Sequence, residues 1–186
     1  MKFKFLTLVL LCILSNQFLT AQSSTQDPRK PDVVNFGPGI GFDYGGLGVN
    51  FMVYPQKNIG IFFGGGYALA GFGYNTGVKL RLSPDRGTVV NPFFTAMYGY
   101  NAAVVITNDA QFNKLFYGPT LGVGIDIRPK KPSSKGYLSI ALMVPLRNAD
   151  AQNYIDLLKS EYGASFTSDL IPVGFSIGYK FILNSN

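Results

Sequence analysis

The feature that most constrains this chain is a period-two alternation of large apolar residues, which recurs in eight runs between Val33 and Phe181. In the last run, for example, Phe175, Ile177 and Tyr179 stand at every second position. Successive side chains of a β-strand point to opposite faces, so this period predicts strands rather than helices. Most runs are close to the ~9–11 residues that a tilted strand needs to cross a bilayer.

The residues on the opposite face of these runs are small or polar. In the sixth and eighth runs they are Gly118, Thr120, Gly122, Gly124, Asp126, Arg128, Gly174, Ser176, Gly178 and Lys180. The alternative fold is a soluble barrel or sandwich. Such a fold would bury its large apolar residues and expose long polar ones. Small polar residues instead suit the narrow lumen of an eight-stranded barrel whose large residues face lipid. The sequence therefore predicts an all-β fold, a closed transmembrane antiparallel up-and-down β-barrel over residues 33–186.

The N-terminus has the order of a secretory signal peptide. Lys2 and Lys4 precede an apolar run that is too short to span a bilayer, and Ala21 offers a cleavage site. We expect residues 1–21 to be removed and residues 22–32 to form a flexible leader, the alternative being an N-terminal membrane anchor. Cleavage takes two of the 16 Lys and Arg residues and leaves 14 against 10 acidic residues, a net charge of +4. It also takes Cys12, the only cysteine, so no disulfide is expected.

The residues that most enzymes and metal sites use are missing from the expected mature chain, which has no cysteine and no histidine. Nucleophilic triads and zinc sites usually depend on these residues. The Gly-x-Gly pairs lie along strands and complete no phosphate-binding motif. We therefore predict no enzyme activity, no catalytic residues, no metal and no cofactor. The modest positive charge is spread along the chain, so we predict no nucleic-acid partner either.

Five charged residues fall on the face predicted to line the lumen. They are Lys79, Arg81, Asp126, Arg128 and Lys180, and we call them the lumen charge cluster. Strand direction places all five in the same half of the barrel, the periplasmic half. A buried charge without a partner is costly, so Asp126 is expected to pair with a neighbouring cation. The cluster is interpreted as a plug held by ion pairs, with an ion pathway as the alternative.

Tyrosine and phenylalanine residues near strand ends are typical of the aromatic girdles at the two membrane interfaces. The residues assigned to these girdles are Tyr54, Tyr98, Tyr100, Tyr117, Tyr137, Tyr179 and Phe181.

Two of the connections predicted to face outward are long, residues 103–116 and residues 147–169, whereas the first, residues 44–46, is short. Within the last connection, Ala151, Ile155 and Leu158 recur at helical spacing and predict a short amphipathic helix. This helix could cover the barrel mouth, lie on the outer leaflet, or pack its apolar side on the loop beneath it.

Several segments resemble small eight-stranded outer-membrane β-barrel proteins of Bacteroidota, a group largely of unknown function. These segments are the export signal ending at Ala21, residues 97–101 (MYGYN), residues 117–124 (YGPTLGVG) and residues 174–181 (GFSIGYKF). The resemblance implies insertion by the outer-membrane assembly machinery, which reads an aromatic-rich last strand. The chain departs from that pattern because it continues for five residues beyond Phe181.

The sequence as a whole predicts a porin-like protein of the cell outer membrane, in contact with lipid and lipopolysaccharide, with an envelope-structural or surface-interaction role. Two alternatives stay open, a narrow channel or small-ligand-binding barrel, and an accessory subunit of a secretion or envelope-assembly complex. The sequence names no protein partner.

Overall fold

The chain forms a closed barrel of eight antiparallel strands in the order β1 to β8, in a computed structural model that describes residues 32–83, 88–106, 110–130, 135–147, 149–162 and 171–185. The expected signal peptide lies outside the described residues, as does the expected leader apart from its last residue. The strands are β1 (Asp32–Gly41), β2 (Gly46–Val53), β3 (Ile59–Tyr67), β4 (Phe72–Arg81), β5 (Val90–Val104), β6 (Lys114–Ile127), β7 (Gly136–Pro145) and β8 (Gly174–Ser185).

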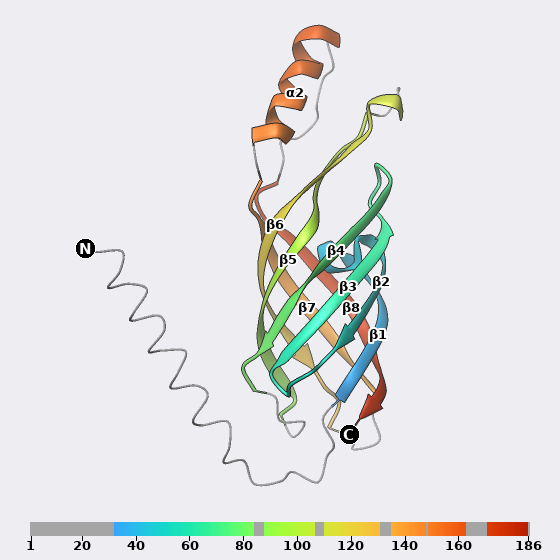
Figure 1. The fold of residues 1–186 in the computed structure, drawn as a ribbon, viewed down its shortest axis with the longest axis vertical. Helices are drawn as coiled ribbons and strands as arrows, with labels where there is room; N and C mark the ends of the chain where they lie inside the picture. Colours follow the sequence, from blue (N-terminus) through green and yellow to red (C-terminus); the bar gives the residue numbers. More distant parts are fainter. Residues whose placement is uncertain are drawn as a thin grey trace, which may run out of the picture.

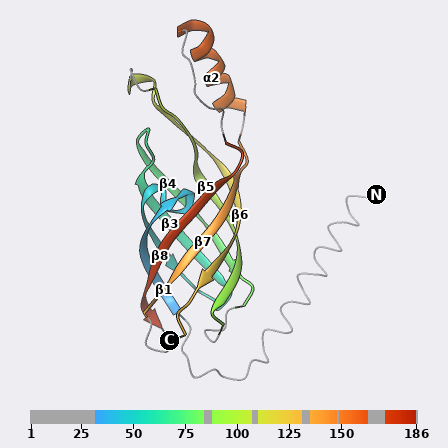
Figure 2. The ribbon, with the colours of Figure 1, turned by 180° about the vertical axis from the view of Figure 1, so that it is seen from behind.

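Each strand pairs with its sequence neighbour, and the ring closes where β1 pairs with β8 (Figures 1 and 2). Cα partners such as Phe36 and Phe181 join the first strand to the last. Closure leaves no unpaired sheet edge. The predicted closed, eight-stranded, antiparallel up-and-down barrel is therefore confirmed, as is one short helix between the seventh and eighth strands.

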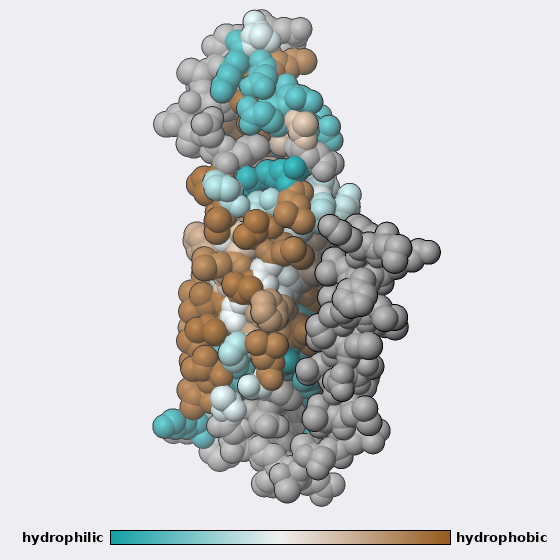
Figure 3. Space-filling view, turned by 90° about the vertical axis from the view of Figure 1, so that its left-hand side faces the viewer, coloured by the Kyte–Doolittle hydropathy of each residue, from teal (hydrophilic) through white to brown (hydrophobic). Residues whose placement is uncertain are grey.

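The large apolar side chains on the outer wall are exposed on all eight strands. Phe63, Phe94 and Val123, for example, are 49–53% exposed. Figure 3 shows the result as a brown, apolar wall along the barrel, with more polar residues toward its ends. The faces of the sheet are thus inverted relative to those of a soluble barrel.

The inside of the barrel holds a feature that the sequence analysis missed. The β1–β2 connection forms a single 3-10 turn, η1 (Phe42–Tyr44), which contacts β1, β2, β3, β4, β5 and β8. The turn can be followed in Figure 1 as the short blue coil within the ring of strands. Tyr44 is completely buried. The short connection expected near residues 44–46 is present at the end of the barrel that carries α2, but the sequence analysis did not predict that its turn folds into the lumen.

Lumen-facing glycines make room for the inserted turn. A Cβ atom added at Gly39 would lie 2.5 Å from the ring of Tyr44, and one added at Gly178 or Gly64 would overlap Tyr44 or the backbone of Asp43. Cβ atoms do not approach other heavy atoms this closely in ordinary packing. Part of the glycine content of the lumen face is thus explained by a piece of backbone, not only by the narrowness of an eight-stranded lumen.

Two buried asparagines, on β2 and β4, hold η1 in place. The Asn50 amide donates a hydrogen bond to the Asp43 carbonyl at 2.6 Å, and the Asn75 amide donates to the Phe42 carbonyl at 2.7 Å. Asn75 also donates to the Tyr100 carbonyl at 2.9 Å, which ties the turn to β5. The Asn50 bond gives the Asp43 carbonyl a partner, and the Asn75 bond adds to the one that the Phe42 carbonyl already accepts from the Gly45 N–H.

Below η1 the lumen contains a small apolar core rather than only polar groups. Phe42 packs against a cluster of inward-facing side chains, Met52, Tyr54, Phe62, Phe93, Met97, Ala141 and Met143. The unbranched methionine side chains fill irregular space between the rings.

At one end of the barrel, β5 and β6 extend into a long hairpin beside the helix α2 (Ala149–Tyr162). Strand pairing continues to Val104 and Lys114, so the connection is shorter than the predicted residues 103–116. Ala151, Ile155 and Leu158 are buried. The last two pack with Val104 of the hairpin, with Ile106, Phe112, Phe116 and Tyr154 around them. The third alternative, a helix that packs on the neighbouring loop, is confirmed.

Among the described residues, no helix is both long enough and apolar enough to cross a membrane.

The inserted turn predicts different costs for two glycine substitutions. Gly39→Ala places a methyl group against the Tyr44 ring and should lower the free energy of unfolding by about 1–3 kcal/mol, as overpacking does. Gly65→Ala is the matched control, because its Cβ would lie no closer than 3.1 Å to the Phe72 ring and 3.8 Å to the Phe63 ring. Urea unfolding of the refolded proteins measures both. Adding Tyr44→Leu should restore part of the loss at Gly39, and equal costs for the two alanines would contradict the insertion of η1.

Candidate functional site

All five residues of the lumen charge cluster are buried inside the barrel, with exposed fractions of 0–7%. Lys79 and Arg81 come from β4, Asp126 from β6 and Lys180 from β8, while Arg128 follows β6 directly. The cross-strand register brings these positions to one level, since Asp126 pairs with Ser139 and Tyr137 pairs with Lys180.

Asp126 is the carboxylate at the centre of the cluster. The Lys79 Nζ lies 2.7 Å from one of its oxygens, and the Arg81 Nε lies 3.5 Å from the other. Lys79 also donates to the Ser139 hydroxyl at 3.3 Å. The expected pairing of Asp126 with a cation is therefore present. Both members of the Lys79–Asp126 pair are nearly inaccessible to solvent, so the pair is desolvated and strongly coupled.

Aromatic rings surround the cations of the cluster. Tyr137, fully buried, accepts a 3.0 Å hydrogen bond from Arg81 and lies 4.5 Å from the Arg128 guanidinium. The Phe93 ring lies 3.6 Å from the Lys79 ammonium, and the Tyr54 ring lies 3.7 Å from the Arg81 guanidinium. Cation–π contacts stabilise cations that have been removed from water. Here they supplement a single central carboxylate.

Lys180 connects the cluster to the inserted turn. Its Nζ lies 4.4 Å from the centre of the Tyr44 ring and makes no hydrogen bond to any residue that the structure describes. The lysine is completely buried. Its contact with Tyr44 therefore links the electrostatics of the cluster to the position of η1.

The sequence analysis assigned Tyr54 and Tyr137 to the aromatic girdles, and this prediction was wrong. Both side chains point inward and lie among the cations. Strand parity could have located Tyr137, because it alternates with the large apolar residues Leu138 and Ile140 and therefore belongs to the opposite, inner face. Of the other girdle residues, Tyr98, Tyr117, Tyr179 and Phe181 are exposed, whereas Tyr100 is half-buried beside the ring of Phe42.

The cluster is suited to holding the barrel together rather than to acid–base or metal chemistry. Its single carboxylate is already paired with Lys79 and Arg81. Within the described ranges, no group of three or more His, Cys, Asp or Glu side chains could hold a metal ion. The geometry is that of a packed, ion-paired cluster in the lumen, in contact with both the apolar core and η1.

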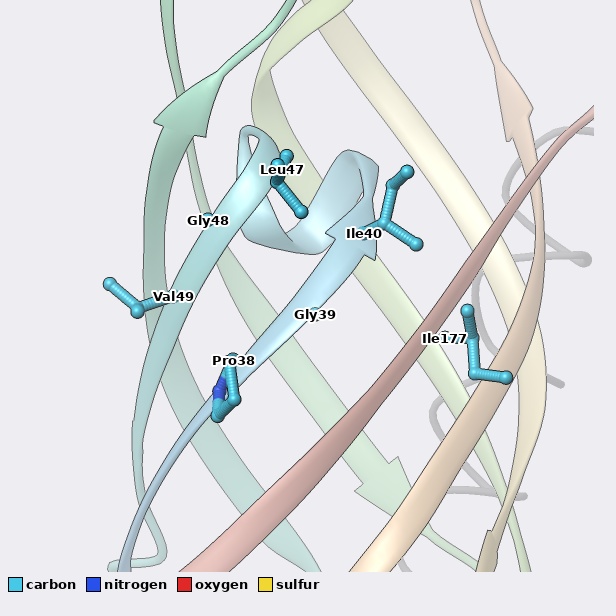
Figure 4. Close-up of a pocket in the computed structure, with 7 residues that line it drawn as sticks. All are labelled: Pro38, Gly39, Ile40, Leu47, Gly48, Val49 and Ile177. Carbon is cyan, nitrogen blue, oxygen red and sulfur yellow. The ribbon is translucent and has the colours of Figure 1, made fainter.

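The outer wall carries one shallow apolar groove of about 560 Å³ where β1, β2 and β8 meet. Figure 4 shows its lining residues, which are Pro38, Gly39, Ile40, Leu47, Gly48, Val49 and Ile177. The groove carries no charged side chain and belongs to the apolar wall.

The chain matches no protein-family model, and its sequence matches no curated protein.

The cluster predicts that Asp126 contributes far more to stability than an uncharged lumen residue. Asp126→Asn keeps the shape of the side chain but leaves Lys79 and Arg81 without their carboxylate, and it should destabilise the barrel by about 3–5 kcal/mol. Ser176→Ala, also in the lumen, is the control and should cost much less. Urea unfolding of the refolded proteins measures the difference.

The double variant Asp126→Asn with Lys79→Met separates charge from packing. Removing the stranded ammonium should recover part of the lost stability, because the buried charge is then absent. Two results together would contradict the proposed role of the ion pair. The double variant would recover no stability, and Asp126→Asn would lower the free energy of unfolding no more than Ser176→Ala does.

Proposed function

We propose that this protein is an outer-membrane β-barrel with a closed lumen and an envelope-structural or surface-interaction role. The single observation that carries the proposal is the wall of exposed apolar side chains, to which all eight strands contribute. Figure 3 shows one side of this wall. A soluble monomer rarely exposes an apolar patch larger than a few hundred Å². A closed barrel satisfies its backbone hydrogen bonds internally, as a hydrocarbon environment requires.

The features of the N-terminus support the same location. Lys2, Lys4 and the apolar run up to Leu14 have the order of an export signal, and Ala21 is a suitable cleavage site. The resemblance to Bacteroidota barrels supports insertion by the outer-membrane assembly machinery. The proposed surroundings are membrane lipid and lipopolysaccharide.

Three sets of residues that fill the lumen favour a closed barrel over a channel. They are the η1 turn, the apolar core around Met52 and Phe62, and the lumen charge cluster, and they contact one another through Tyr44, Tyr54 and Phe93. Eight strands enclose a space that side chains alone can fill. The proposed role is accordingly one of structure or surface contact, and enzyme activity is not part of it.

The β5–β6 hairpin and α2 are the parts that fit a surface-interaction role. They extend beyond the barrel at the same end (Figure 1) and support each other through Ile155, Leu158 and Val104. The Tyr154 hydroxyl donates to the Phe112 carbonyl at 2.9 Å, and the Lys114 ammonium lies 4.7 Å from the Tyr154 ring. Such a packed projection presents a defined shape to a partner.

Substitution on the wall tests whether lipid covers it. Val123 is 49% exposed near the middle of β6, and Val123→Arg should cost about 2–4 kcal/mol in a bilayer, as arginine does at the midplane of other barrels. Val123→Thr should be much milder. Refolding into vesicles, followed by the difference in migration between unheated and boiled samples, measures folding. Unimpaired folding of the arginine variant would exclude Val123 from the lipid-facing surface.

The closed lumen predicts little or no ionic current. Refolded wild-type protein in planar bilayers should give no steady single-channel conductance, because η1 and the charge cluster fill the interior. Replacing Phe42–Tyr44 with three glycines removes the side chains of the turn and should raise the frequency of openings. Robust currents through the wild type would favour a narrow channel instead.

A further inference from the structure

A second hollow lies at the mouth of the barrel, at the end that carries α2. Its volume is about 620 Å³, and residues of η1, the ends of β1, β2, β5 and β8, and the connections beside them line it. Pockets for small molecules usually measure about 300–1,000 Å³. The barrel wall is low here because the β1–β2 connection turns into the lumen instead of extending outward.

One end of this mouth pocket is polar and donates hydrogen bonds. Arg147 donates to the Asn101 carbonyl at 3.2 Å and to the Ile171 carbonyl at 2.6 Å, which fixes the position of its guanidinium. In the part of the chain that the structure describes, no carboxylate pairs with Arg147. The amide nitrogen of Asn101, which also lines the pocket, is buried without a hydrogen-bond partner among those residues.

Burial lowers the pKa of the Arg147 guanidinium from its ordinary value, and nearby Tyr100 opposes the shift. Arginine nevertheless stays charged in proteins. An anionic group beside it would offset the cost of burying this charge, and the guanidinium fork matches a carboxylate.

The other end of the pocket is apolar and continuous with the outer wall. Ile40, Leu47, Leu69 and Phe175 line it, and all four are also exposed on the surface that we propose to be covered by lipid. A chain-like apolar ligand could therefore lie across the low wall, with its polar end at Arg147 and its tail along the barrel.

We propose that the mouth pocket binds a long-chain fatty acid, with the carboxylate held by Arg147 and Asn101 and the acyl chain on the apolar side. The inference rests on the proposed membrane location. Two donors, with no carboxylate paired to them among the residues that the structure describes, favour an anion. The volume suits one acyl chain better than a lipid with several chains.

Photolabelling in bilayers tests this site directly. Wild-type protein refolded into phosphatidylcholine nanodiscs would be exposed to palmitate that carries a diazirine on its chain, and the labelled peptides mapped by mass spectrometry. We expect competable labelling of residues 100–103 and 171–175. Unlabelled palmitate should compete at least about ten-fold better than hexadecanol, which has the same chain without the charge, because a charged hydrogen bond contributes that much affinity.

Variants separate the pocket from general contact with lipid. Arg147→Gln should lower the competable labelling about ten-fold, whereas Lys135→Gln, an exposed cation outside the pocket, should leave it unchanged. Ala103→Trp adds a large side chain to the pocket lining and should also abolish the labelling. This variant provides the test if Arg147→Gln does not fold. Equal competition by hexadecanol, or labelling unaffected in a folded variant, would overturn the inference and leave the membrane location intact. Failure of the wild type to insert into nanodiscs would overturn both.

Discussion

Closing eight strands into a ring creates an interior that must be filled, and most of this structure follows from how that space is used. The chain fills it partly with its own backbone, because the β1–β2 connection turns inward as η1. Glycines such as Gly39 and Gly178 leave space for Tyr44, and the amides of Asn50 and Asn75 hold the turn in place. The inward turn also lowers the wall at the barrel mouth, where the mouth pocket lies.

The same constraint explains how several cations can be buried with few carboxylates nearby. Asp126 pairs with Lys79 and Arg81, while the rings of Tyr137, Phe93 and Tyr44 lie against the cations of the cluster. Lys180 contacts the ring of Tyr44 in the inserted turn, so the lumen charge cluster and η1 pack directly against each other. A packed interior of this kind agrees with the proposal of a closed barrel rather than a pore.

The fold could be predicted from the sequence because each alternating run marks one strand, and the period of two assigns each residue of a run to one face of the sheet. The charged lumen residues were located by the same parity, and the pairing of Asp126 followed from the cost of an isolated buried charge. The insertion of η1 was not predictable in this way, because its causes are contacts between distant strands, such as Asn75 with Phe42. Tyr54 and Tyr137 were misplaced because proximity to a strand end was given more weight than parity.

The central claim is that one face of the sheet meets lipid and the other is sealed inside, and spin labelling along β6 tests it most directly. The only native cysteine, Cys12, lies in the expected signal peptide, so single cysteines can be introduced one at a time at positions 121, 123 and 125, and at the buried lumen position Ser176. In vesicles, labels at 121, 123 and 125 should be relaxed strongly by oxygen, which concentrates in hydrocarbon, and only weakly by a water-soluble nickel complex. The cysteine at position 176 should not react with the label in the folded protein. Strong relaxation by the nickel complex at 121, 123 and 125 would contradict the account, because water would then cover the face assigned to lipid.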